Sequence, residues 1–267
     1  MKNRSMLLLA LCYVLASGTQ PVSGRSEIKW RLVFNDEFNR PNGSMPDTSK
    51  WTECPREIYL WNRWCKTTKE NVFVRNGRLI CRAIPNPDMK ADTAAMFTGA
   101  IQTKGKYQFQ YGKIEVRLRT NMKPGNFPAA WLMPLSAGTP YRYGEFDIFE
   151  TFGNDGLAHQ TVHSHRSFAL AKEAGKRSFT KKMDLTKWHV YGMEWNKDNI
   201  SFFVDGVLTG FYQKSNNQTL LKEGQWSFDR PFYIILNQSV GNDNWNTPDH
   251  QTIYETQFDW IRVYQKE

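Results

Sequence analysis

Three carboxylates lie in the short apolar stretch Gly144–Glu150, which reads Gly-Glu-Phe-Asp-Ile-Phe-Glu. Regular strand alternation would place Glu145 and Asp147 on one face of a strand and Glu150 on the other. One extra residue, a β-bulge between Asp147 and Glu150, would bring all three acids to the same face. We expect this bulge, because bulges are common beside active sites. The side chains that then point into the core are Phe146 and Ile148.

Carboxylates held close together on one face are suited to acid–base chemistry, because their mutual repulsion raises at least one pKa. A retaining glycosidase needs an ionised carboxylate as nucleophile and a protonated carboxyl as acid, about 5 to 5.5 Å apart. Asp147, between the two glutamates, can help to set their pKa values apart. The same residues would also suit an exposed acidic strand face or a divalent cation site, and so short a motif does not separate these alternatives.

The elements that would position these acids are strands. Val72–Ile84 and Ile200–Leu208 each alternate around a central Asn-Gly or Asp-Gly pair, which is a strong hairpin signal. Phe109–Arg119 alternates apolar and charged residues, and no stretch keeps a period of 3.6 over three turns. We therefore expect an all-β fold, a sandwich of two antiparallel sheets.

Further stretches accompany the acidic motif in a fixed order. They are Asp36-Glu37-Phe38, Gly99 to Arg119, Phe127 to Trp131, Thr161-Val162-His163, Trp188 to Trp195, Phe203 to Gly206 and Phe258 to Tyr264. Together they resemble glycoside hydrolase family 16, which includes laminarinases, lichenases, agarases and carrageenases, in its bulged E-x-D-x-x-E form. The resemblance covers most of residues 30–264. It implies a β-jelly roll of two curved antiparallel sheets with a concave substrate cleft.

A cleft that binds sugars needs flat aromatic rings and short polar side chains, because sugars offer apolar ring faces surrounded by hydroxyls. Most of the ten tryptophans have to pack in the core. Trp131, in the strand that resembles the family's cleft strand, and Trp245, in a polar loop, are the candidate platforms. His163 matches the family's cleft histidine, and Asn237 and Gln238 resemble residues of the cleft floor.

One departure from the family bears on the substrate. Many glucan-specific members carry Trp-Pro five and four residues before the nucleophile, where this chain has Pro140 and Tyr141. Without that tryptophan an axial 4-hydroxyl can fit, so a galactose unit becomes a candidate beside glucose. Tyr143 is a further candidate for sugar contact, because its ring can fill the same space.

The resemblance also implies a possible structural calcium ion far from the cleft. Glu37, Gly77 and Asp259 resemble the calcium position that many members carry, and oxygen ligands suit that ion. We expect no cofactor for catalysis.

The N-terminus has the layout of a signal peptide. Two basic residues precede an apolar run from Met6 to Ala16, and small residues follow up to Gly24. The run is too short for a membrane span. We expect a secreted, periplasmic or cell-surface protein, with residues 1–24 as the signal peptide and residues 25–267 as one catalytic domain that acts as a monomer.

Charge and cysteine content restrict the partners. Removing the two basic residues of the signal lowers the formal net charge from +9 to +7. No run of five or six basic residues occurs, so we expect no nucleic acid partner, and the surplus charge indicates either an acidic polysaccharide or only solubility. Three cysteines remain, and because this number is odd they cannot all pair within the chain. Cys54 and Cys65 can form a disulfide bridge, and Cys81 is expected to be buried as a small apolar side chain.

We therefore predict a retaining endo-β-glycanase in which, by the family resemblance, Glu145 attacks the anomeric carbon, Glu150 is the acid and base, and Asp147 tunes Glu145. The substrate is a glucan with β-1,3 or mixed linkages, or a β-linked galactan, including sulfated galactan and the poly-N-acetyllactosamine of mucin-type O-glycans. The alternatives outside this class are a non-catalytic carbohydrate-binding protein on the same fold and a calcium-binding or acidic-surface scaffold.

Overall fold

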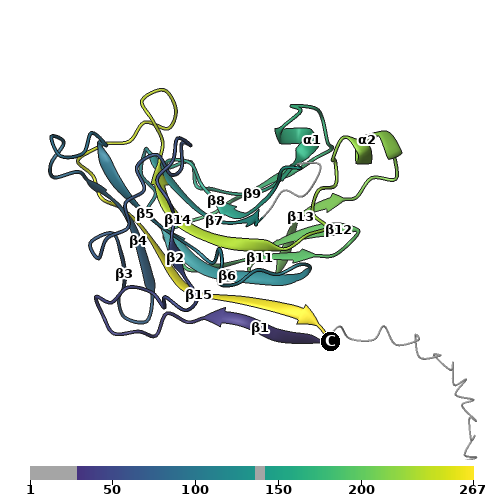
Figure 1. Ribbon diagram of the computed structural model, residues 1–267, viewed down its shortest axis with the longest axis horizontal. Helices are drawn as coiled ribbons and strands as arrows, with labels where there is room; N and C mark the ends of the chain where they lie inside the picture. Colours follow the sequence, from purple (N-terminus) through teal and green to yellow (C-terminus); the bar gives the residue numbers. More distant parts are fainter. Residues whose placement is uncertain (1–28, 136–141) are drawn as a thin grey trace, which may run out of the picture.

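The computed structural model describes residues 29–135 and 142–267 (Figure 1). Within these ranges fifteen strands form one continuous antiparallel sheet that folds back on itself into two curved layers. This arrangement confirms the all-β jelly roll expected from the strand patterns. The predicted signal peptide, residues 1–24, and the departure at Pro140 and Tyr141 lie outside the described residues.

The first layer, here called the cleft layer, carries the acidic motif near its middle. Its strands in spatial order are β10 (Ser178–Lys182), β9 (Leu157–Ser164), β8 (Gly144–Glu150), β7 (Asn126–Pro134), β14 (Phe232–Val240) and β5 (Met96–Gln102), with β2 (Thr52–Glu53) beside β5. Two short helices stand beside the concave face of this layer (Figure 1). They are α1 (His165–Phe168) and α2 (Gln218–Lys222).

The second layer, here called the outer layer, lies behind the first. Its strands in spatial order are β4 (Leu79–Pro85), β15 (Tyr254–Lys266), β6 (Gly112–Thr120), β11 (His189–Trp195), β12 (Asn199–Val204) and β13 (Val207–Gln213), with β1 (Trp30–Asp36) beside β15 and β3 (Val72–Val74) beside β4. The pairing of β4 with β5 joins the two layers. Among the described residues, no helix has the length and apolar character needed to cross a bilayer.

Two predicted hairpins are confirmed. The β3–β4 turn contains Asn76 and Gly77 with φ of 53° and 66°, and the β12–β13 turn contains Asp205 and Gly206 with φ of 51° and 77°. Positive φ at both central positions twists a two-residue turn in the same sense as its strands. These turns therefore fix the register of the outer layer.

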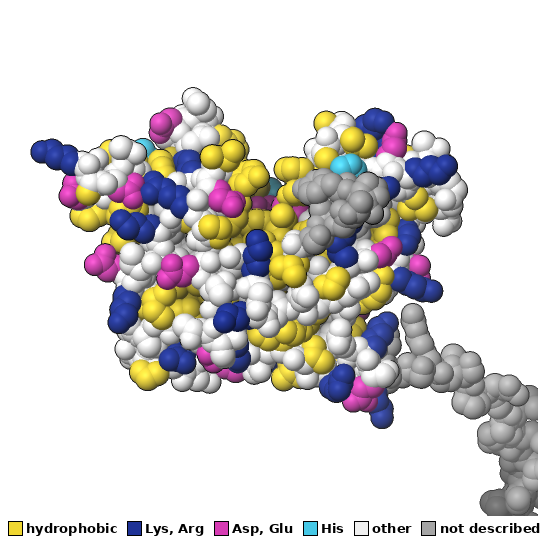
Figure 2. Space-filling view, in the orientation of Figure 1, with side chains coloured by type: hydrophobic (Ala, Val, Ile, Leu, Met, Phe, Trp, Pro, Cys, Tyr) yellow, Lys and Arg dark blue, Asp and Glu magenta, His cyan; other side chains and the backbone are white. Residues whose placement is uncertain are grey.

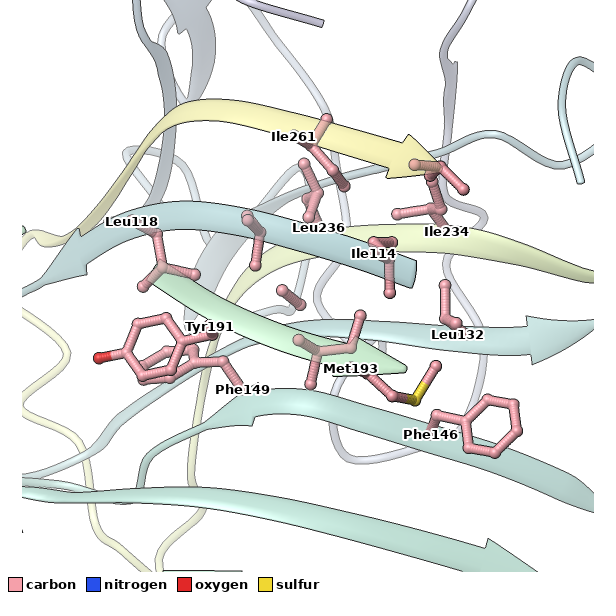
Figure 3. Close-up of a cluster of buried hydrophobic side chains, with 14 of the residues drawn as sticks. Ile114, Leu118, Leu132, Phe146, Phe149, Tyr191, Met193, Ile234, Leu236 and Ile261 are labelled. Carbon is pink, nitrogen blue, oxygen red and sulfur yellow. The ribbon is translucent and has the colours of Figure 1, made fainter. Parts of the chain in front are cut away.

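The core lies between the two layers and follows from strand alternation. Along β6 the side chains alternate strictly between buried and partly exposed, with Ile114, Val116 and Leu118 pointing inward, in agreement with the alternation of apolar and charged residues in the sequence. Figure 3 shows Ile114 and Leu118 in one cluster with residues from the cleft layer, such as Phe146 of β8 and Leu236 of β14. Packing of one layer on the other therefore holds the acidic strand from behind.

The three cysteines within the described residues are all free and buried. Cys54 and Cys65 share a small apolar cluster, but the bridge that their spacing allowed is not formed. Cys81 lies in the main core, as expected for a small hydrophobe.

The centre of the core provides a stability test. Phe146 is fully buried, and its ring centroid lies 4.7 Å from those of Phe228 and Phe232. Phe146→Ala is expected to lower the free energy of unfolding by about 3–5 kcal/mol, because it removes buried apolar surface and leaves a cavity. Chemical denaturation measures this loss. The matched control Phe211→Ala, at a ring that is 48% exposed, is expected to cost far less, and equal losses would contradict this packing.

Candidate active site

The predicted bulge lies in β8, the strand that carries the three acids. Against β9, Glu145 pairs with His163 and Asp147 with Thr161, and the register then shifts before Glu150 pairs with His159. The pairing of β8 with β7 shifts at the same place, which leaves Ile148 as the extra residue. The bulge expected from the sequence is confirmed.

The bulge sorts the side chains of β8 into two sets. Phe146, Ile148 and Phe149 are all buried in the core between the layers. The side chains that point to the concave face are Glu145, Asp147 and Glu150. Figure 2 shows that this face is hollowed between two raised walls, with acidic side chains at the floor of the hollow.

Glu145 is held in a partly buried, hydrogen-bonded position. Its side chain is 14% exposed, and burial, helped by the charge of Asp147, raises the pKa of Glu145 to about 7. The Tyr143 hydroxyl donates to Glu145 Oε2, and His163 lies 3.6 Å from Oε1. Both neighbours favour the ionised form, so Glu145 can act as a nucleophile near neutral pH.

Asp147 and Glu150 form a coupled pair. Their carboxyls are hydrogen-bonded to each other, and burial raises the pKa of both. Glu150 has its pKa raised well above the usual range, since the nearby charges of Asp147 and Glu145 add to the effect of burial. The pair therefore holds one proton, and Glu150 is the better placed to keep it.

His163 links this pair to a cation. Its Nε2 lies 3.0 Å from Asp147 Oδ2, and its Nδ1 lies 3.3 Å from Nη1 of Arg177. A guanidinium has only donors, so Nδ1 has to accept and the proton of a neutral imidazole has to sit on Nε2. Arg177 thus places the proton of a neutral His163 on Nε2, the nitrogen that lies beside Asp147.

The sequence left a divalent cation at the acids as an alternative. Ligand atoms of Glu145, Asp147 and His163 do lie within 4.8 Å of one another. However, Nδ1 of His163 accepts from Arg177, so the ring proton sits on Nε2, the nitrogen that faces the carboxylates, and the Arg177 cation contacts the same ring. A protonated nitrogen cannot bind a metal and a neighbouring cation repels one, so this trio is poorly suited to a cation site.

The two tryptophans chosen as platforms have different surroundings. Trp131 is only 7% exposed, donates from Nε1 to Asn237 Oδ1 at 2.8 Å, and meets the ring of Trp61 edge-on. It therefore forms the floor, with little surface to offer a sugar. Trp245 is 40% exposed and rests edge-on against Phe127 and Phe152, so its ring is available for stacking.

Neighbouring residues of β14 point in opposite directions, which corrects one prediction. Asn237 supports Trp131 from the cleft side. Gln238 is fully buried, donates to Asn126 at 2.8 Å and accepts from Thr256 at 2.6 Å. Its polar atoms are thus used between the two layers, and the predicted contact of Gln238 with substrate is wrong.

The predicted calcium position does not fit that ion. Both Glu37 oxygens accept hydrogen bonds from Arg262, at 2.8 and 2.9 Å. Asp259 accepts from Arg117 and lies 3.5 Å from Arg78 Nε. Cations already neutralise these carboxylates, and two arginines beside Asp259 would repel a divalent ion.

Sequence reasoning missed Trp61 and Arg177. Trp61 was detectable in principle, because it lies in a loop with Tyr59 and Trp64, an unusual density of aromatic rings for a loop. Arg177 gave no local signal, since only the pairing of β9 with β10 brings it to His163.

The tautomer of His163 provides a test that does not depend on activity. In the parent protein, ¹⁵N NMR is expected to show neutral His163 with its proton on Nε2. Arg177→Met removes the donor and should yield a mixture of tautomers, whereas Arg177→Lys keeps a donor and should preserve Nε2–H. A parent imidazole with its proton on Nδ1 would contradict the assigned network.

Comparison with known proteins agrees with this geometry. Residues 63–262 match the family described as glycosyl hydrolases family 16. The chain is 30% identical over 241 residues to keratan-sulfate endo-1,4-beta-galactosidase of Sphingobacterium multivorum, covering 88% of this chain and 55% of that protein. It is 31% identical over 264 residues to glucan endo-1,3-beta-glucosidase A1 of Niallia circulans, covering 88% of this chain and 38% of that protein.

Among solved structures, the laminarinase from Rhodothermus marinus superimposes with a TM-score of 0.77 and 29% identity, over 90% of this chain and 99% of that one. This chain spans about half or less of the two sequence relatives named above. The matched region nevertheless includes the bulged strand and most of both layers. The chain belongs to glycosyl hydrolases family 16.

Proposed function

We propose that this protein is a retaining endo-β-glycanase that cleaves internal β-glycosidic bonds of a polysaccharide or glycan. The observation that carries this proposal is the bulge at Ile148, because it turns Glu150 to the face that Glu145 and Asp147 already occupy. Two carboxyls on one face, one inclined to ionise and one to stay protonated, are what retaining hydrolysis needs.

In the first step the carboxylate of Glu145 attacks the anomeric carbon. The bond from that carbon to the glycosidic oxygen breaks as the new ester bond forms, and Glu150 gives its proton to the departing oxygen. Asp147 then shares the charge that develops on Glu150 through their hydrogen bond. His163, oriented by Arg177, steadies Asp147 during this change.

In the second step Glu150 acts as a base. It takes a proton from water, the water oxygen attacks the anomeric carbon, and the ester bond to Glu145 breaks. Both carboxyls then return to their starting forms. No metal ion or organic cofactor enters either step of this mechanism.

The hollow between two raised walls supports action within chains, because a groove accepts a polymer that extends past both ends of the site (Figure 2). On the Glu150 side, the exposed ring of Trp245 can stack on a sugar. On the Glu145 side, Phe168 of α1 is 55% exposed and stacks on Tyr143, with ring centroids 4.0 Å apart. Aromatic surface thus flanks both glutamates.

Two substrate classes compete for this cleft. One relative is named for cleaving keratan sulfate, a β-galactosidic substrate, and the other for cleaving β-1,3-glucan. The surplus of positive charge suits a sulfated or sialylated galactan. Mass spectrometry of the products from laminarin, mixed-linkage glucan, agarose, keratan sulfate and mucin O-glycans separates the two classes directly.

The proposal includes export, with residues 1–24 as a signal peptide and residues 25–267 as the catalytic domain. It rests on the sequence layout of the N-terminus.

A non-catalytic carbohydrate-binding protein is the alternative function. The Asp147–Glu150 pair argues against it, because a binding protein gains nothing from the free-energy cost of holding two carboxyls together largely out of water.

Substitution of the two glutamates tests their separate roles. Glu145→Gln and Glu150→Gln are each expected to lower kcat on a natural polysaccharide by at least about 10²-fold. On an aryl glycoside whose leaving group needs no proton, Glu150→Gln should regain formation of the glycosyl-enzyme, seen as a burst of phenol, whereas Glu145→Gln should stay inactive. The exposed Glu70→Gln serves as control. Unchanged turnover in both variants would contradict the proposal.

The dependence of rate on pH tests the electrostatics. Glu145 has a pKa of about 7, so kcat/KM should fall as the pH drops through that value and the nucleophile becomes protonated. The pKa of Glu150 is raised well above its usual range, so the rate should fall again at higher pH, when the acid loses its proton. A profile that stays flat down to pH 5 would show that Glu145 is not held as described.

A further inference from the structure

A second cluster of functional groups lies on the outer layer, on the face turned away from the cleft. Arg117 and Arg119 point outward from β6, Arg78 immediately precedes β4, and Trp188 immediately precedes β11. The three guanidinium carbons lie 5.0, 5.1 and 4.8 Å from the centre of the Trp188 ring for Arg78, Arg117 and Arg119. We call these four residues the Trp188 cluster.

The Trp188 cluster has more positive charge than its neighbours neutralise. Asp259 accepts from Arg117 and lies 3.5 Å from Arg78 Nε. Arg119 donates to Gln257, at 3.1 and 3.2 Å, which brings no negative charge. Among the described residues, Asp259 is thus the one carboxylate paired with these three cations, which leaves an excess of two positive charges.

The cluster also holds unused hydrogen-bond donors. Each guanidinium has five N–H groups, far more than Asp259 and Gln257 can accept together. The Nε of Arg78 is buried and makes no hydrogen bond within the described part of the chain. A buried donor without a partner costs free energy, and a bound anion with several oxygens would supply the missing acceptors.

The same pattern continues along the outer face. Arg75 and Arg82 both lie beside Phe73, with guanidinium carbons 5.7 and 4.9 Å from its ring centre, and both pair with the single carboxylate of Glu255. The two groups together carry five arginines against two acids. Cationic and aromatic side chains that alternate over neighbouring strands fit an extended ligand better than a small ion.

We propose that this outer face is a second binding site, specific for an anionic polysaccharide that carries sulfate esters. Arginine forks match the paired oxygens of a sulfate group, and the rims of Trp188 and Phe73 offer apolar contact to sugar rings. The half-buried rings lie under guanidinium groups and cannot insert between stacked bases, which disfavours nucleic acid. The site does not require the cleft to be catalytic, and its place on the far face would let one protein hold a polymer while the cleft acts on it.

Binding of dextran sulfate tests this proposal. This polymer carries sulfate on an α-linked backbone, which a cleft for β-glycans should not accept. In a Glu145→Gln background at physiological ionic strength, Arg78→Gln/Arg119→Gln is expected to weaken the Kd by about tenfold or more, since it removes two charged donors. It keeps the Arg117–Asp259 pair. Neutral dextran should not bind either protein.

The matched control removes two exposed lysines elsewhere. Lys90→Gln/Lys197→Gln lowers the net charge equally and should change the Kd by less than about twofold, if local geometry and not overall charge binds the polymer. Equal weakening by both double variants would overturn the proposal. So would equally tight binding of double-stranded DNA of matched length with the same arginine dependence.

Two further measurements keep the outcomes distinct. Thermal unfolding shows whether the double variant folds. If it does not fold, the single variant Arg78→Gln replaces it and is expected to weaken the Kd for dextran sulfate threefold or more. An unchanged Kd would count against the site. With Glu145 restored, the arginine variants should hydrolyse a neutral substrate at the parent rate. A protein that binds dextran sulfate but hydrolyses nothing would overturn the proposed function and leave this inference standing.

Discussion

The active site depends on the burial of two adjacent residues, Ile148 and Phe149, on the same side of β8. Without the bulge, Phe149 would face the cleft and Glu150 would face the core. Exposing a fully buried phenylalanine costs about 1.5–3 kcal/mol, and placing an ionised glutamate in an apolar core costs several kcal/mol more. Both effects act in the same direction, so hydrophobic packing behind the strand decides where the glutamate points.

The site has a second requirement, since three closely spaced acids, one buried and two partly buried, cannot all be ionised at once. A proton shared by Asp147 and Glu150 removes one charge, while the Tyr143 hydroxyl and His163 favour the ionised form of Glu145. Arg177, which immediately precedes β10, determines which nitrogen of His163 carries the proton. The asymmetry between the two glutamates thus arises from their neighbours, since both are of the same residue type.

Much of this arrangement could be predicted from sequence, because it follows from local periodicity. Alternation predicted the inward residues of β6, the Asn-Gly and Asp-Gly pairs predicted two hairpins, and the spacing of the acids predicted the bulge. The predicted substrate contact of Gln238 was wrong because it followed the family resemblance and not strand alternation. Gln238 follows Asn237 in a strand, so the two side chains have to face opposite ways. Residues that meet only through strand pairing, such as Arg177 with His163 and Arg262 with Glu37, gave no local signal.

The stereochemistry of the first product tests the central claim, that the bulge places two glutamates close enough for a covalent two-step reaction. In ¹H NMR spectra taken early in hydrolysis, the account predicts that the new reducing end appears first as the β-anomer and equilibrates later. Initial appearance of the α-anomer would contradict it, because inversion requires carboxyls about 6.5–9.5 Å apart with a water molecule between them and the sugar.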